Sequence, residues 1–229
     1  VYKSKATTLY LPEGTASTLT DGTDNTFSDS YSSAEEEEPN ACLYSKSDLV
    51  IAGSGSLTVN ANYNNGITGK DTLFIQKASV TVTAVNHGIN GKDSLTIKDA
   101  DITVTSGGDA LRPTNDIDPN LGYLVITGSA LKLTAGEDGI QAETTLTISG
   151  GTATVTTAGG AGQSISDDTS AKGLKAGTQV TVTGGTFQLN CCDDAIHSNG
   201  DVTISGGSVT IATGDDGMHA DDTLSISSG

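Results

Sequence analysis

The stretch CCDDAIHSNGDVTISGGSVTIATGDDGMHADDTLSIS, residues 191–227, contains the same pattern twice. Asp193-Asp194 is followed by a small residue, an apolar residue and a histidine, and the pattern returns 22 residues later at Asp215-Asp216. Between the two copies lie two runs of alternating apolar and polar residues, separated by Gly206-Gly207. Alternation with a period of two is typical of a β-strand that has one buried face. The stretch therefore predicts a repeating all-β unit.

The same unit can be followed through most of the chain by the small residue after each acidic pair, which we call the marker. The markers are Gly66, Gly88, Ala110, Gly139, Gly173, Ala195 and Gly217, and an apolar residue follows each of them. Successive markers are 22, 22, 29, 34, 22 and 22 residues apart. The two long intervals contain insertions, RPTNDIDPNLG at 112–122 and AGGAGQSISDDTSA at 158–171. Such a period indicates repeats that bury their apolar faces by stacking on one another.

The pattern predicts an all-β fold, a right-handed parallel β-helix of about eight coils with a 22-residue repeat, because no segment has helical periodicity. Each coil has two short strands and a third bend at the marker, and the handedness follows the usual rule for parallel crossovers. Alanine replaces glycine at two markers, which indicates a need for a small side chain more than for a positive φ. We assign residues 42–229 to this solenoid. Residues 1–41, with the acidic stretch SSAEEEEPN, form an N-terminal segment that caps the solenoid or pairs with a neighbouring molecule.

The charge of the chain excludes two classes of partner. Eleven basic residues against 28 acidic residues give a formal net charge of −17. This charge repels nucleic acid and anionic membrane surfaces, and it attracts cations. The sequence has no membrane-spanning run, and its first residues, VYKSKATTLYLPEG, do not resemble a signal peptide. Because the sequence does not begin with Met, we expect a mature secreted chain, located outside the cell or on its surface.

The acidic pairs predict calcium sites. Neighbouring coils are about 4.8 Å apart, so Asp194 should stack on Asp216 and Asp193 on Asp215. Carboxylates this close repel one another unless a cation lies between them. Ca²⁺ prefers six to eight oxygen ligands, which carboxylates and turn carbonyls provide. The predicted ligands are Asp109, Glu137, Asp138, Asp193, Asp194, Asp215 and Asp216. The insertions would add Asp116 and Asp118 to one site and Asp167 and Asp168 to another.

The segments GEDGIQAETTLTISGGT, KGLKAG, DDAIHSNGDVTISGG and GDDGMHADDTLSI resemble a bacterial secreted β-helix family. The family is labelled carbohydrate-binding domain-containing protein. The resemblance runs from about residue 7 to the end, and the family's Asp-Asp-Gly-Ile corners match 193–196, 215–218 and, with Glu first, 137–140. It implies a pectate-lyase-like β-helix that binds calcium. It also implies binding to cellulose and acidic sugars such as polygalacturonate, without demonstrated cleavage.

We predict a secreted, non-catalytic protein that binds plant cell-wall or matrix polysaccharide through Ca²⁺ at the acidic corners. The predicted sugar-contacting residues are Lys175, His197, His219, Arg112 and Tyr123. His197 and His219 share a column and could instead form a surface ladder or hold a transition metal.

Two alternatives remain open. One is a structural or matrix fibre, built by head-to-tail pairing of open coil ends. The other is a polysaccharide lyase, which needs a cation and a basic residue that removes a proton, with Arg112 or Lys172 as candidates.

Overall fold

The structure is a computed structural model that describes residues 4–24, 39–166 and 168–228. Every regular element in these ranges is a β-strand, and every strand pair is parallel. The strands form one sheet of 15 strands and one of eight. No helix among the described residues is long and apolar enough to span a membrane. The predicted all-β fold with parallel strands is confirmed.

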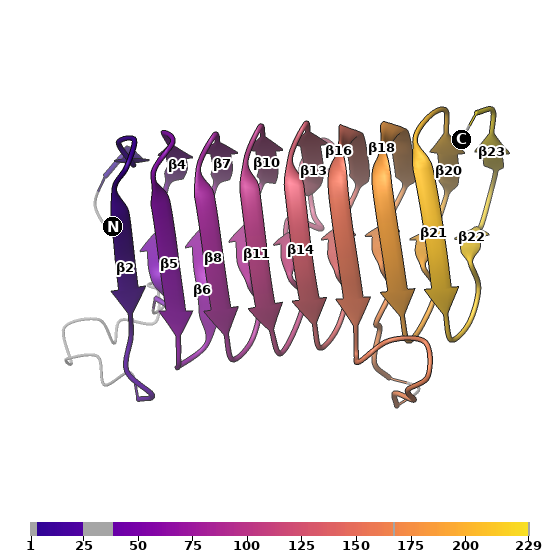
Figure 1. Cartoon of the computed structure of the whole chain (residues 1–229), viewed down its shortest axis with the longest axis horizontal. Helices are drawn as coiled ribbons and strands as arrows, with labels where there is room; N and C mark the ends of the chain where they lie inside the picture. The colour runs from indigo at the N-terminus through magenta and orange to yellow at the C-terminus, as the bar shows by residue number, and fades with distance from the viewer. Residues whose placement is uncertain (1–3, 25–38, 167, 229) are drawn as a thin grey trace.

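Each repeat has three successive strand positions, which we call its first, second and third legs, and we call one such repeat a coil. The coils stand side by side from the N-terminal to the C-terminal end (Figure 1). The first legs are β1 (Ala6–Tyr10), β4 (Asp48–Ala52), β7 (Thr72–Gln76), β10 (Ser94–Lys98), β13 (Tyr123–Thr127), β20 (Asp201–Ile204) and β23 (Leu224–Ile226). The second legs are β2 (Ala16–Thr20), β5 (Ser56–Ala61), β8 (Ser79–Ala84), β11 (Asp101–Ser106), β14 (Ala130–Ala135) and β21 (Ser208–Thr213). Both legs are continuous in β16 (Thr145–Thr157) and β18 (Gln179–Cys191), which joins them into the 15-stranded sheet.

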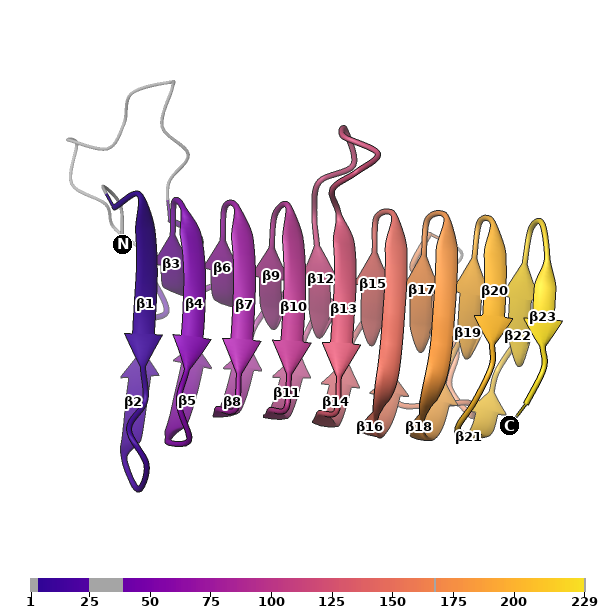
Figure 2. The same cartoon turned by 90° about the horizontal axis from the view of Figure 1, so that it is seen from above.

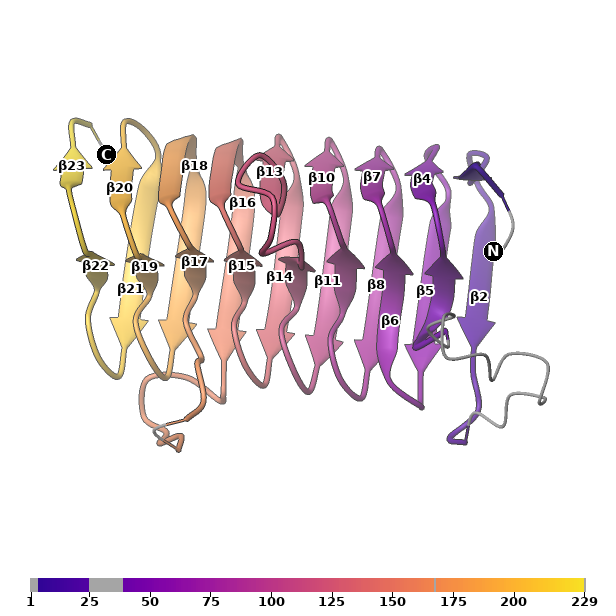
Figure 3. The ribbon, with the colours of Figure 1, turned by 180° about the vertical axis from the view of Figure 1, so that it is seen from behind.

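The third legs form the eight-stranded sheet. They are β3 (Ala41–Ser45), β6 (Asn65–Gly69), β9 (Ile89–Gly91), β12 (Leu111–Pro113), β15 (Ile140–Ala142), β17 (Leu174–Ala176), β19 (Ile196–Ser198) and β22 (Met218–Ala220). From β9 onward, each third leg begins at the apolar residue that follows a marker. The first insertion projects between β12 and β13 (Figure 2), and the second lies before β17 (Figure 3). Both insertions therefore fall between strands, as their sequence position predicts.

The core is a set of apolar columns that run through the coils. Leu73 pairs with Leu95, and Leu95 pairs with Leu124, and all three side chains are fully buried. Along each strand the buried residues alternate with more exposed ones, as in β8 and β14. The period-two pattern of the sequence thus gives the correct register, because a shift of one residue would turn the whole apolar column outward.

The N-terminal segment belongs to the stack in its described part. β1 pairs with β4 and β2 pairs with β5, so residues 4–24 extend both legs of the larger sheet by one coil. Leu9 and Leu19 pack against the core from these strands. The described part of the N-terminal segment therefore lies at the end of the stack, where a capping segment would lie, and the boundary between residues 41 and 42 stays a prediction. Residues 32–38 of the acidic stretch lie outside the described residues.

Four of the marker glycines, Gly66, Gly88, Gly139 and Gly173, are needed for their small size. A Cβ atom on Gly88 would lie 2.4 Å from Val104 Cγ1 and 2.5 Å from the carbonyl oxygen of Ala110 in the next coil. The φ angle of Gly88 is not positive. Close approach of the next coil, and not an unusual backbone conformation, therefore selects the small residue, as the alanines among the markers predict.

Replacing Gly88 with alanine should destabilise the protein by about 1–3 kcal/mol, the usual cost of overpacking a filled interior. The added Cβ must displace backbone, which moves less easily than the end of a side chain. Urea unfolding followed by circular dichroism measures the change. Gly162→Ala is the matched control, because a Cβ there meets nothing within 4 Å. Equal stability of the two variants would contradict this account.

Candidate functional site

The residue before each marker belongs to a column at the edge of the third legs, which we call the corner column. Its members are Asn65, His87, Asp109, Asp138, Lys172, Asp194 and Asp216. Each of the first six markers donates a backbone hydrogen bond to the corner residue of the next coil, for example from Gly88 N–H to the Asp109 carbonyl at 2.9 Å. The corner residues therefore stack one per coil, as the repeat spacing predicts.

Three acidic side chains of the corner column hold the next coil by a hydrogen bond. Asp109 Oδ1 accepts one from the N–H of Asp138 at 2.9 Å. Asp138 Oδ1 accepts one from the N–H of Lys172 at 2.7 Å, and Asp194 Oδ1 accepts one from the N–H of Asp216 at 3.0 Å. A backbone N–H without a partner in a protein interior is unfavourable, so these carboxylates stabilise the corners. The spacing of the acidic pairs does not predict this role of the stacked acids.

A second column lies two residues after the markers, and we call it the central column. Its members are Thr68, Asn90, Arg112, Gln141, Lys175, His197 and His219. Four of the five predicted sugar-contacting residues therefore share one column. The fifth, Tyr123, lies on β13 in the larger sheet, paired in register with Ser94.

The basic residues of the central column pair with the acids of the corner column. Arg112 Nη1 lies 2.8 Å from Asp109 Oδ2, and Lys175 Nζ lies 2.9 Å from Asp138 Oδ2. Burial, and then the nearby Asp138 carboxylate, raises the pKa of Asp109 to about 6, although Arg112 acts in the opposite direction. The chain itself therefore supplies part of the positive charge that the stacked acids require.

At the C-terminal end, three carboxylates come together. Asp193, Asp194 and Asp215 can each offer one oxygen atom, and these atoms lie within 4.8 Å of one another. Asp193 and Asp215 also line a cavity of about 300 Å³ beside the second insertion. Lys172 contacts Asp193 and lies 4.0 Å from Asp194. This donor set fits Ca²⁺, which prefers hard oxygen ligands.

The predicted bridge between Asp194 and Asp216 has a different geometry from that cluster. Oδ1 of Asp194 accepts the N–H of Asp216, and Oδ2 of Asp216 lies 3.3 Å from His219 Nδ1. Sharing of one ion by these two side chains stays a prediction. Of the insertion residues, Asp168 is exposed and Asp167 lies outside the described residues.

The second predicted calcium site, of Asp109, Glu137 and Asp138, also differs from the group of side chains that the structure brings together. His87, Asp109 and Glu137 come within 4.8 Å of one another, whereas the Asp138 carboxylate, 1% exposed, is engaged by Ser170 and Lys175. Asp109 lies before β12, whereas Asp116 and Asp118 lie after β12 in the first insertion. Asp118 accepts hydrogen bonds from Asn120 within that loop.

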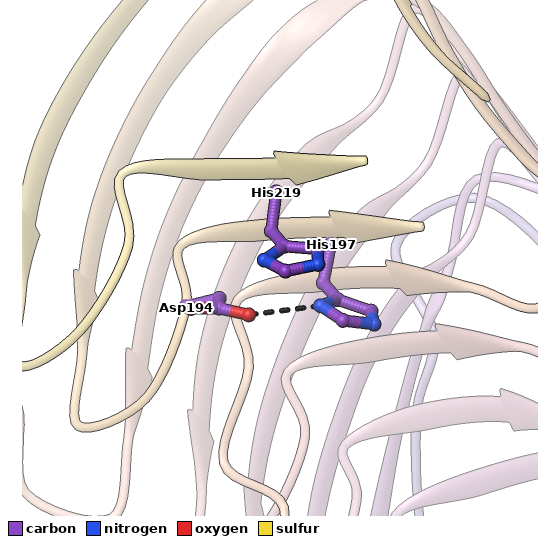
Figure 4. A group of neighbouring side chains, drawn as sticks. All are labelled: Asp194, His197 and His219. Carbon is purple, nitrogen blue, oxygen red and sulfur yellow. Dashed lines mark hydrogen bonds and ion pairs between the residues drawn. The ribbon is translucent and has the colours of Figure 1, made fainter. Parts of the chain in front are cut away.

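The two histidines lie on neighbouring strands beside Asp194 (Figure 4). Their ring centroids are 4.8 Å apart with an angle of 20° between the planes. His197 Nδ1 lies 2.8 Å from Asp194 Oδ2. Hydrogen bonds with Asp221 and then Asp216 raise the pKa of His219. The three side chains form a donor group within 4.8 Å, but the ring nitrogens already have partners in the chain. This favours the surface-ladder interpretation.

The acidic pairs of the sequence do not point to the N-terminal half of the central column. Thr68 and Asn90 pair in register, and Asn90 pairs with Arg112, so the three lie on successive coils. Neither Thr68 nor Asn90 is charged, so neither stood out in a search for acidic pairs. Alignment of the second residue after every marker would have placed them beside Arg112.

Three comparisons with known proteins agree on a sugar-related family. A carbohydrate-binding domain-containing protein of Acetivibrio thermocellus is 46% identical over 134 residues, which are 57% of this chain and 47% of the relative. The chain thus spans about half the length of that relative. A solved structure titled polysaccharide lyase-like protein from C. thermocellum, gadolinium derivative, matches with a TM-score of 0.56 and 26% identity, over 98% of this chain and 66% of that one. The family model for carbohydrate-binding domain-containing proteins matches residues 3–217, so the chain belongs to this family.

Proposed function

We propose that the chain is a right-handed parallel β-helix that binds an acidic polysaccharide along its third legs, with Ca²⁺ at the acidic corner and without cleavage. Each strand pairs in parallel with the equivalent strand of the next coil, which supports the helical winding. Crossovers between parallel strands of one sheet are right-handed in about 98% of cases, which supports the handedness.

The observation that carries the proposal is the unbroken polar face of the third legs. The corner and central columns run beside each other through the coils, with a side chain of each column about every 4.8 Å. Carboxylates, amides, a hydroxyl, imidazoles and cations all occur along these columns. A sugar chain presents hydroxyl and carboxylate groups at repeated intervals, so a face with repeated polar groups suits it. Membership of a carbohydrate-binding family supports the same ligand class.

Ca²⁺ would link the sugar to the cluster of Asp193, Asp194 and Asp215, which we call the acidic corner. Asp193, Asp194 and Asp215 would hold the ion, and a calcium ion with six to eight oxygen ligands has positions left for sugar carboxylates. Lys172 competes for the same carboxylates and sets the affinity. The source of the polysaccharide is a plant cell wall or an extracellular matrix, and the protein acts outside the cell or on its surface. Head-to-tail assembly stays a prediction.

The arrangement of the basic residues favours binding over lyase chemistry. A lyase base must be able to accept a proton from the sugar. Arg112 Nη1 lies 2.8 Å from Asp109 Oδ2, and Lys172 Nζ contacts Asp193. Both predicted bases are therefore engaged by a carboxylate of the chain.

We expect the protein to bind polygalacturonate and to leave the polymer intact, because both predicted bases are paired with carboxylates of the chain. Sedimentation of the protein with insoluble polygalacturonate measures binding. Ultraviolet absorbance of unsaturated uronate products measures cleavage in the same mixture with calcium. A steady rise in that absorbance, lost in Lys172→Gln or Arg112→Gln, would overturn the proposal in favour of a lyase. Absence of sedimentation would overturn it altogether.

A further inference from the structure

The N-terminal half of the central column lines a second cavity, of about 250 Å³, away from the acidic corner. Its walls come from the third legs β6, β9 and β12, which lie side by side in Figure 2, and from residues that flank them, among them Lys70 and Lys92. Sites for drug-sized ligands are usually about 300–1,000 Å³, so this cavity suits a single sugar unit.

Three polar atoms at this cavity have no hydrogen-bond partner among the described residues. They are Thr68 Oγ1, Asn90 Oδ1 and Arg112 Nε. Thr68 and Asn90 are each only 6% exposed. Buried polar atoms normally have partners, and each exception needs an explanation. A rotation about a side-chain bond would turn the Thr68 hydroxyl or the Asn90 amide toward a bound ligand.

The other half of the same column differs. Gln141 Nε2 donates to Glu143 at 3.1 Å, Lys175 pairs with Asp138, and His197 pairs with Asp194. The chain therefore provides partners for the C-terminal members of the central column. It does not do so for the named atoms of Thr68, Asn90 and Arg112, which lie on consecutive coils.

The charged side chains that line this cavity are basic, whereas the net charge of the chain is negative. Lys70, Lys92 and Arg112 line it, and in the described part of the chain no carboxylate does. His87 contributes no charge at neutral pH, because burial and then Arg112 lower its pKa to about 4. Arg112 Nη1 is engaged by Asp109 and His87, and its Nη2 lies 3.9 Å from Glu143 Oε1, whereas its buried Nε has no hydrogen-bond partner among the described residues. Such a set of cations selects an anionic ligand in a chain whose formal net charge is −17.

We infer that this cavity binds one uronic-acid unit directly, with its carboxylate at Lys70, Lys92 and Arg112 and its hydroxyls at Thr68 and Asn90, and without a cation. The inference rests on the proposed function, because it assumes that the third legs bind acidic polysaccharide. It adds a calcium-independent subsite at the opposite half of the same face.

The test is calorimetric titration of the chain with trigalacturonate in the presence of EDTA. The wild-type chain should bind. Lys92→Gln should weaken binding about tenfold, the usual effect of losing a hydrogen bond to a charged group. Lys98→Gln is the matched control, since Lys98 is an exposed lysine on β10 in the larger sheet. It should bind within about twofold of wild type, as expected of a surface change away from the ligand.

Asn90→Leu gives a second test with a different readout. Leucine has the same number of side-chain heavy atoms in a similar branched shape and removes the unpartnered amide oxygen, so the unfolding temperature should stay the same or rise. Binding of trigalacturonate in EDTA should fall about tenfold in the same variant. A purely structural role for Asn90 would move both measurements in the same direction and would overturn the assignment.

The outcomes separate this inference from the proposed function. Binding with calcium but none in EDTA would overturn the subsite and leave the proposed function intact. Equal binding by the wild type, Lys92→Gln and Lys98→Gln would also overturn the subsite. Tighter binding of a sulfated or a neutral trisaccharide than of trigalacturonate would contradict recognition of a carboxylate. No binding with or without calcium would overturn both.

Discussion

Replacing Asp138 with alanine should destabilise the fold by about 3–5 kcal/mol, the usual cost of removing one partner of a buried ion pair. The side chain is 1% exposed. Its Oδ1 accepts hydrogen bonds from Lys172 N–H at 2.7 Å and Ser170 Oγ at 2.7 Å, and its Oδ2 lies 2.9 Å from Lys175 Nζ. The alanine variant therefore leaves a backbone donor and a cation without their acceptor at the base of the second insertion. Urea unfolding followed by circular dichroism measures the loss.

Two further variants separate the causes of this loss. Asp138→Asn keeps an acceptor for the Lys172 N–H and removes only the charge, so its stability should lie between those of wild type and Asp138→Ala. Asp116→Ala is the matched control for charge, because Asp116 is exposed in the first insertion. It should change stability by less than about 0.5 kcal/mol. If Asp138→Ala unfolds like Asp116→Ala, the corner carboxylates do not hold the coils together.

The strand register could be predicted from the sequence because each coil must bury the same face. The columns that begin with Leu73 and Val80 recur at fixed offsets from the markers, and both pair in register in the structure. The insertions could be located for the same reason, since they interrupt the period and leave the columns intact. The local alternation of apolar residues and the long-range repeat predict the same strand register, so the register can be predicted from the sequence.

The first coil could not be predicted in this way. β1 and β2 carry Leu9 and Leu19 at strand positions, but no marker precedes them, and 25–38 separate them from the first recognisable repeat. Pairing with β4 and β5 stabilises these strands, and such long-range contacts have no local signal. The assignment of residues 1–41 to a separate segment reflects this.

The residues of the candidate site could be predicted from the sequence, but their contacts could not. The sequence places Asp109, Asp138 and Asp194 in one column, which the structure confirms. It does not tell whether a carboxylate faces an ion, a cation of the chain or a backbone N–H. In the structure each of these three accepts a backbone N–H with one oxygen and faces a basic side chain with the other. One side chain thus serves both the fold and the polar face.

Calcium should increase both stability and polysaccharide binding through the cluster of Asp193, Asp194 and Asp215. An ion that binds only the folded state adds about 2.7 kcal/mol at a concentration one hundred times its Kd. Asp215→Asn removes one of three close carboxylates and should lower calcium affinity about tenfold or more, because affinity depends on the charge of the ligands. Asp216→Asn is the matched control, because the carboxylate of Asp216 faces His219 and does not belong to this cluster. A larger loss in Asp216→Asn than in Asp215→Asn would instead support the bridge between Asp194 and Asp216.

The calcium dependence of polygalacturonate binding tests the central claim most directly. The titration is done by calorimetry with the wild-type chain in calcium, with the wild-type chain in EDTA, and with Asp215→Asn in calcium. We predict the tightest binding for wild type in calcium, and a fall in Asp215→Asn toward the level that wild type shows in EDTA. Equal affinity in all three titrations would contradict a role for calcium at the acidic corner, and no binding in any of them would contradict the proposed function itself.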